Sequence, residues 1–266
     1  MENVDRWAGH TPMSDPAAHI GIVAGLPSDV GTLNRIIQGL LVHSDWLGAY
    51  GLDGGDHRGV SRDTLPVADR LDEILANSSK NLEDPRSPGK RSVATCRDFP
   101  LMLCSFLRSK DTPARVRCGF ANYFSTAWED HWVCEYRNRQ ARKWRLSDAQ
   151  MDGLLTAKCR IAFDPTDVPR RAFMTAGEAW LACRSGKLDP HRFGHGEVTG
   201  PWFIKINVLR DHYVLNGRET SAWDGWRAAS PSNRIIGEHE VTLLNDLAAR
   251  PEQELVEVAP DWLDEG

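Results

Sequence analysis

The chain has 266 residues, and its 32 lysines and arginines against 37 aspartates and glutamates give a formal net charge of −5. A hydrophobic content of 41% and a charged content of 26% are typical of globular proteins and exclude wholesale disorder. With no basic stripe, no apolar run of about 18–20 residues and no N-terminal secretory signal, we expect a soluble, cytoplasmic protein with no nucleic-acid or membrane partner.

We expect a single domain over residues 1–266, which begins with an N-terminal helical part at residues 20–90. Apolar residues recur at helical spacing from Val30 to Leu41, and the run Pro27-Ser28-Asp29 ahead of them supplies an N-cap for this helix. The same period returns over residues 65–76 and stops at a polar run. Residues 80–91 are rich in charge, proline and glycine, so they are predicted to form an exposed loop.

Residues 91–152 have a different character and are predicted to form the core. The segment Cys96–Lys110 is apolar almost all round, which is typical of a buried central helix. Pro100 is tolerated only in the first turn, so this helix should begin near Thr95 or Cys96. Three short strands with short connections follow, which favours antiparallel pairing. They are predicted at Ala114–Ala121, His131–Arg137 and Lys143–Asp148.

A C-terminal helical extension is predicted over residues 155–266. Helical spacing of apolar residues returns there three times, over Pro169–Ser185, Trp202–Asn216 and Gly237–Arg250. The order of elements predicts an α+β fold, in which a central helix packs on an antiparallel sheet and further helices wrap both.

Three residues of the predicted core could form a catalytic relay. Cys96 would lie at a helix start, where the helix dipole favours the nucleophilic thiolate. His131 opens the second strand, and Asp148 ends the third, where its carboxylate could orient the imidazole. Each residue taken alone could instead have a structural role: Cys96 as a core cysteine, His131 as a structural histidine and Asp148 as a turn residue. Together they make a complete Cys–His–Asp set for nucleophilic catalysis.

Four ordered segments of the core resemble the transglutaminase-like superfamily. They are Arg91–Phe99 (RSVATCRDF), Thr112–Phe120 (TPARVRCGF), Asp130–Tyr136 (DHWVCEY) and Trp144–Asp148 (WRLSD). The resemblance covers about residues 90–152 and implies a papain-like α+β core with Cys96 as nucleophile, His131 as base and Asp148 as the orienting acid. Members commonly carry glycine at or next to the position before the cysteine, whereas this chain has Ala94-Thr95.

This resemblance implies a thiol-dependent acyl-transfer enzyme that works through a thioester intermediate. We expect it to hydrolyse an amide or peptide-like bond of a small acyl or peptide-like substrate, without a metal or other cofactor. One alternative is an amide-forming acyltransferase of a natural-product biosynthetic pathway. A second is a non-catalytic binding or scaffold module that keeps the transglutaminase-like fold.

Further polar and aromatic residues are candidates for the substrate site, namely Trp132, Arg115, Trp46 and Gln150. Each has an alternative role: core packing for Trp132, helix-end packing for Trp46 and a turn for Gln150. Arg115 and Arg117 share a strand face and could together bind a substrate carboxylate, and ion pairs with Asp98 or Glu135 are the main alternative for both. The oxyanion donor could be the backbone N–H of Cys96 or a side chain among Gln38, His43 and Trp46. Asn207, Arg210 and Asp211 form either a buried salt-bridge network or a substrate contact.

Overall fold

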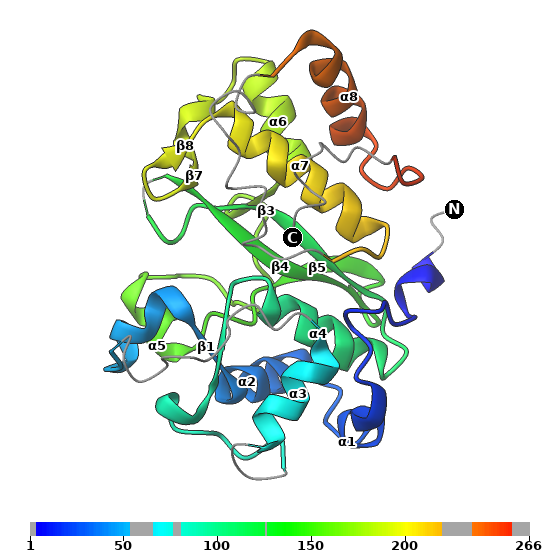
Figure 1. Ribbon diagram of the computed structural model, residues 1–266, viewed down its shortest axis with the longest axis vertical. Coiled ribbons are helices and arrows are strands. Elements are labelled where there is room, and N and C mark those ends of the chain that lie inside the picture. Colours follow the sequence, from blue (N-terminus) through cyan, green and yellow to red (C-terminus); the bar gives the residue numbers. More distant parts are fainter. Residues whose placement is uncertain (1–3, 54–65, 77–80, 126, 220–235, 257–266) are drawn as a thin grey trace. The chain divides into compact units, whose positions relative to one another are not determined.

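The computed structural model describes residues 4–53, 66–76, 81–125, 127–219 and 236–256 (Figure 1). The chain forms two compact units, one of residues 1–116 with 133–168 and one of residues 117–132 with 169–266. Helices and a mixed sheet make up the structure, so the predicted α+β class is confirmed. None of the helices in the described residues combines the length and the apolar character needed to cross a bilayer.

The first unit contains the helices that the periodicity predicts between residues 29 and 76. Helix α2 (Val30–Leu40) begins where Asp29 accepts the backbone N–H of Thr32 at 2.8 Å, and α3 (Val67–Ala76) follows. Helix α4 (Asp98–Arg108) is buried along its whole length, as its all-round apolar sequence predicts. The unit also holds α1 (Ile20–Ala24), α5 (Gly153–Lys158) and the 3₁₀ helices Val4–Trp7, Ala17–His19, Ser44–Tyr50 and Pro88–Lys90.

Two short strands of this unit were not predicted. Strand β1 (Leu41–His43) pairs in parallel with β2 (Ser92–Ala94), and His43 lies opposite Ala94. Each strand has three residues, which is too short to show an alternating pattern. The pair places the end of α2 beside the segment that leads into α4.

The larger sheet is mixed, which corrects the expected antiparallel sheet. Strand order is β6-β3-β4-β7-β8, and β5 also pairs with β4. The β4–β5 pair is antiparallel as predicted, with Cys134 opposite Ser147, but β7 joins β4 in parallel. The bounds are β3 Ala114–Ala121, β4 Trp128–Asn138, β5 Lys143–Ser147, β6 Phe173–Thr175, β7 Phe193–His195 and β8 Val198–Thr199.

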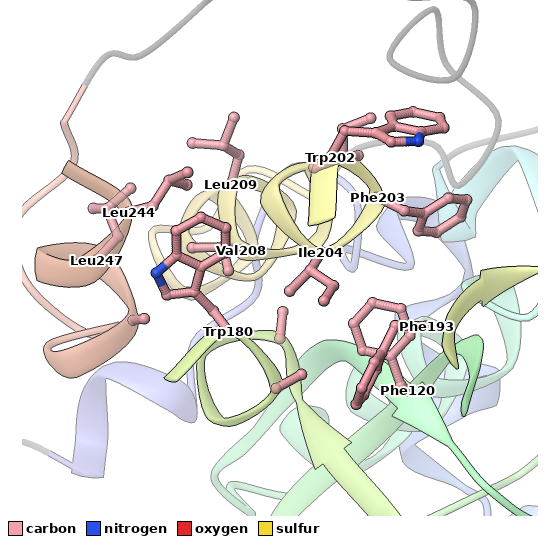
Figure 2. Close-up of a cluster of buried hydrophobic side chains, with 14 of the residues drawn as sticks. Phe120, Trp180, Phe193, Trp202, Phe203, Ile204, Val208, Leu209, Leu244 and Leu247 are labelled. Carbon is pink, nitrogen blue, oxygen red and sulfur yellow. The ribbon is translucent and has the colours of Figure 1, made fainter. Parts of the chain in front are cut away.

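The second unit packs three helices against strands of this sheet. The helices are α6 (Ala176–Arg184), α7 (Pro201–Leu215) and α8 (Glu238–Ala249), with a 3₁₀ helix at Pro190–Arg192. Figure 2 shows the apolar cluster that joins them, in which Trp180 of α6 and Leu244 of α8 meet Ile204 of α7, with Phe120 and Phe193 on the sheet side.

The helix predicted over Pro169–Ser185 is shorter than expected. Residues Phe173–Thr175 form β6 and pair with Gly119–Ala121 of β3. Thr175 then caps α6 through a reciprocal pair of hydrogen bonds with Glu178, so the helix starts only at Ala176.

Gly119 is required by the close approach of β3 to β6. A Cβ atom there would lie 2.2 Å from the carbonyl oxygen of Met174. We expect Gly119→Ala to lower the free energy of unfolding by about 1–3 kcal/mol, because backbone must move to admit the methyl group. Urea unfolding followed by circular dichroism measures this change. Gly153→Ala is the matched control, since a Cβ at Gly153 meets no atom within 4 Å, and equal losses in both variants would contradict the packing argument.

Candidate active site

Cys96 lies in the turn between β2 and α4 and is 8% exposed. The expectation that the helix begins at Thr95 or Cys96 is wrong by two residues or more, because α4 starts at Asp98 with Arg97 as its N-cap. The backbone N–H of Asp98 donates to the carbonyl of Thr95 at 3.1 Å, which closes a separate turn ahead of the helix. Cys96 is therefore held inside this turn, beside the helix N-terminus rather than within the helix.

A buried carboxylate fixes the turn that carries Cys96. Asp98 Oδ2 accepts hydrogen bonds from the backbone N–H of Thr95 at 2.7 Å and from its hydroxyl at 3.1 Å. The same carboxylate pairs with Arg97 Nη2 at 3.0 Å and with Arg70 Nη2 at 3.4 Å. Arg70 also donates to the carbonyl of Val93 at 2.6 Å, so α3, β2 and the start of α4 share one network. Sequence reasoning missed Arg70, which reads as an ordinary surface position of an amphipathic helix.

His43 is the N-terminal residue that the β1–β2 pairing brings beside this turn. It is 6% exposed, lies in register with Ala94, and its ring stacks on Phe99 at 6.5 Å between centroids. Its Nδ1 accepts the backbone N–H of Asp45 at 3.0 Å, so a neutral ring carries its proton on Nε2 and can donate from there. Nε2 is therefore the atom that His43 could offer to an oxyanion. Trp46 is half-buried in the 3₁₀ helix that follows.

Asp148 directly follows β5 and is 1% exposed. Its backbone N–H donates to the carbonyl of Pro165 at 2.8 Å, and its Oδ1 accepts the backbone N–H of Gln150 at 3.0 Å. The preceding residue, Ser147, accepts a hydrogen bond from Asn34 of α2 at 2.9 Å. Gln150 is 3% exposed, and within the described residues its side-chain Oε1 has no hydrogen-bond partner. Gln150 therefore offers a buried acceptor two residues from Asp148.

His131 lies on β4 and is 1% exposed. Its imidazole makes edge contacts with the rings of Phe124 at 4.8 Å and Tyr123 at 5.9 Å, both from the segment between β3 and β4. The neighbouring Asp130 accepts a hydrogen bond from Asn207 of α7 at 2.8 Å, which anchors this part of the strand. His131 belongs to the second unit, whereas Cys96 and Asp148 belong to the first. The relay among the three residues stays a prediction.

Arg115 forms the ion pair that was the alternative to substrate binding. Its Nε donates to Glu135 Oε2 at 2.8 Å, and both side chains are buried. The guanidinium also lies over the rings of Trp144 at 4.4 Å and Trp7 at 5.1 Å. These contacts favour a structural role for Arg115. Trp132 is fully buried, which likewise favours core packing.

Arg117 finds its carboxylate on α7 rather than at Asp98 or Glu135. Its Nε and Nη2 donate to the two oxygens of Asp211 at 3.0 and 2.7 Å, and the backbone N–H of Cys118 donates to the same carboxylate at 2.9 Å. Arg210 Nη1 donates to Asn207 Oδ1 at 3.2 Å. The polar residues of α7 therefore form the buried network that was one of the two expectations for them.

Within the part of the chain that the structure describes, no group of three or more His, Cys, Asp or Glu residues is placed to hold a metal ion. Comparison with protein-family models, with curated proteins and with solved structures finds no match for this chain.

We expect Asp98→Asn to lower the free energy of unfolding by about 3 kcal/mol. The amide still accepts the bonds from Thr95, but it leaves Arg70 and Arg97 buried without their shared counter-charge, and breaking buried pairs typically costs about 3–5 kcal/mol. Urea unfolding measures the loss. Asp72→Asn is the control, because that carboxylate is exposed, and a similar loss there would contradict the argument.

Proposed function

We propose that this protein is a thiol-dependent acyl-transfer enzyme with a transglutaminase-like, papain-like core. Cys96 would be the nucleophile, His131 the general base and acid, and Asp148 the group that orients the imidazole. The four ordered sequence segments between Arg91 and Asp148 support this assignment, and so does the surrounding α+β structure.

The position of Cys96 supports its role as nucleophile. The residue stands beside the N-terminus of an 11-residue buried helix, whose dipole stabilises negative charge on a nearby sulfur. The turn is held by the Asp98 network, so the thiol is presented by a fixed backbone. Such preorganisation favours attack on a bound carbonyl.

The order of nucleophile, base and acid along the chain, within four segments that resemble one family, is the observation that carries the proposal. His131 lies on β4 three residues before Cys134, Cys134 is opposite Ser147, and Asp148 follows Ser147. Asp148 is buried and accepts the backbone N–H of Gln150, so its carboxylate is held in a fixed position, as a group that orients a base must be.

In the proposed reaction the Cys96 thiolate attacks an amide, ester or thioester carbonyl. The imidazolium of His131 gives its proton to the leaving amine, alcohol or thiol as the carbon–heteroatom bond breaks, and a Cys96 thioester remains. The neutral imidazole then takes a proton from the acceptor, which attacks the thioester and releases the thiolate. The backbone N–H of Cys96 and Nε2 of His43 are the candidate donors to the oxyanion. Water as the acceptor gives hydrolysis, and an amine gives the alternative amide-forming reaction.

Intact-mass spectrometry after incubation with a panel of small amides, esters and thioesters tests the covalent step. We expect an acyl adduct on the wild-type chain that is lost in Cys96→Ala and retained in Cys183→Ala, a half-buried thiol that serves as the control. Replacement of the base in His131→Asn should slow adduct formation about 10²–10⁴-fold. An adduct that persists without Cys96 would overturn the assignment.

The rate of alkylation by iodoacetamide at pH 7 distinguishes a catalytic Cys96 from a non-catalytic binding or scaffold module. Burial raises the pKa of the Cys159 thiol, and burial together with the charge of Asp189 raises that of Cys183 to about 11, so both are protonated at this pH. We expect Cys96 to react at least about tenfold faster than these two thiols, although it is less exposed, because a thiolate is the reactive form. Peptide mass spectrometry gives the three rates. Equal or slower reaction of Cys96 would favour a non-catalytic module.

A further inference from the structure

The first unit contains a polar cavity of about 750 Å³ that the proposed chemistry does not use. It lies where the start of α2, the end of α4 and the hairpin of β4 and β5 come together. Helix α4 separates it from Cys96, because Cys96 precedes the helix and Lys110 follows it. At a rise of about 1.5 Å per residue, the helix keeps the two about 16 Å apart.

Four cationic residues and one acidic residue line this cavity. The cationic residues are Lys110, Arg137, Arg139 and Arg145, and the acidic residue is Asp29. The Asp29 carboxylate is engaged at the start of α2, where it accepts the backbone N–H of Thr32 at 2.8 Å and its hydroxyl at 3.0 Å. The lining therefore carries a surplus of positive charge in a chain whose net charge is negative.

Three of these four cations have no carboxylate partner among the described residues. Lys110 Nζ donates to the carbonyls of Val23 and Ala24 at 3.3 and 3.1 Å, and burial lowers the pKa of this ammonium. Arg139 Nη2 donates to two more carbonyls, those of Lys110 and Asp111, at 2.6 and 2.8 Å. These bonds hold the cations in place without neutralising them.

The remaining two arginines lie on opposite strands of the hairpin. Arg145 pairs with Asp167 at 3.0 Å, and both side chains are partly exposed. In the hairpin register Arg137 is opposite Trp144 and Tyr136 is opposite Arg145, so the side chains of Arg137 and Arg145 leave opposite faces of the strands. Tyr136 also lines the cavity, and the cation that shares its face is Arg145. The planar fork of donors on Arg145 matches the oxygens of a phosphate group.

We propose that this cavity binds a phosphate-bearing small molecule. The cationic lining supplies counter-charges for more than one negative charge, which suits a phosphate or diphosphate better than a monocarboxylate. The first turn of α2 adds the backbone N–H groups of Val30 and Gly31 and the positive end of the helix dipole. A volume of about 750 Å³ falls in the range of about 300–1,000 Å³ that is usual for small-molecule sites. This inference does not depend on the proposed acyl-transfer activity.

Titration calorimetry of the full chain with pyrophosphate tests the proposal. We expect saturable binding that Arg145→Gln weakens about tenfold, through loss of a charge-assisted contact. Arg160→Gln is the matched control, because it removes the same charge from an exposed position of the same unit outside the cavity, and it should bind as the wild type does. Lys110→Gln is a second variant, beyond the end of α4, and should also weaken binding, so a folding failure of one variant leaves the test open to the other. Cys96→Ala should bind pyrophosphate unchanged.

Inorganic phosphate and citrate complete the comparison. Phosphate binding that is saturable but weaker than that of pyrophosphate supports a site for more than one phosphate group. Citrate that binds more tightly than pyrophosphate would overturn the ligand class and indicate a polycarboxylate. Absence of saturable binding, or equal weakening in Arg145→Gln and Arg160→Gln, would overturn the site itself.

Discussion

Buried arginines impose the constraint on which the rest of this structure depends. Arg70, Arg97 and Arg117 are at most 6% exposed, and a guanidinium stays charged at any physiological pH. Each must therefore meet an acid or a set of carbonyl oxygens inside the protein, since an unpaired buried charge costs several kcal/mol. Asp98 serves this purpose in the first unit and Asp211 in the second, and each also accepts a backbone N–H. Asp98 thereby links α3 to the start of α4, and Asp211 links β3 to α7.

The same charge pairs hold the backbone around the candidate catalytic residues. The Asp98 network fixes the turn that carries Cys96, and Asn207 holds Asp130, the residue before His131. Asp148 is set by its own backbone bond to Pro165 and by the neighbouring contact of Ser147 with Asn34. The backbone at the proposed catalytic residues is therefore held by contacts that also stabilise the fold.

Helix α4 adjoins both the proposed nucleophile and the proposed anion-binding cavity. Its N-terminal end adjoins Cys96, where the helix dipole favours a thiolate, and the chain just beyond its C-terminal end contributes Lys110 to the cationic cavity. Because the helix is buried throughout, neither end can shift without disturbing the core of the first unit. A nucleophile at one end and an anion site at the other can therefore be tested independently by substitutions that leave the helix intact.

Local features of the sequence were enough to predict α2, the strand Ala114–Ala121 and the buried helix α4, because hydrophobic periodicity acts within one element. The order of these elements was enough to predict the α+β class. The order of motifs was enough to nominate Cys96, His131 and Asp148. The partners of the buried charges were decided by the tertiary structure alone, since Arg117 pairs with Asp211 and not with Asp98 or Glu135. The strand at Phe173–Thr175 was not predicted, because three residues are too few to show a period. The physical reason is that ion pairs and short strands are stabilised by groups distant in sequence, whose approach only the folded chain determines.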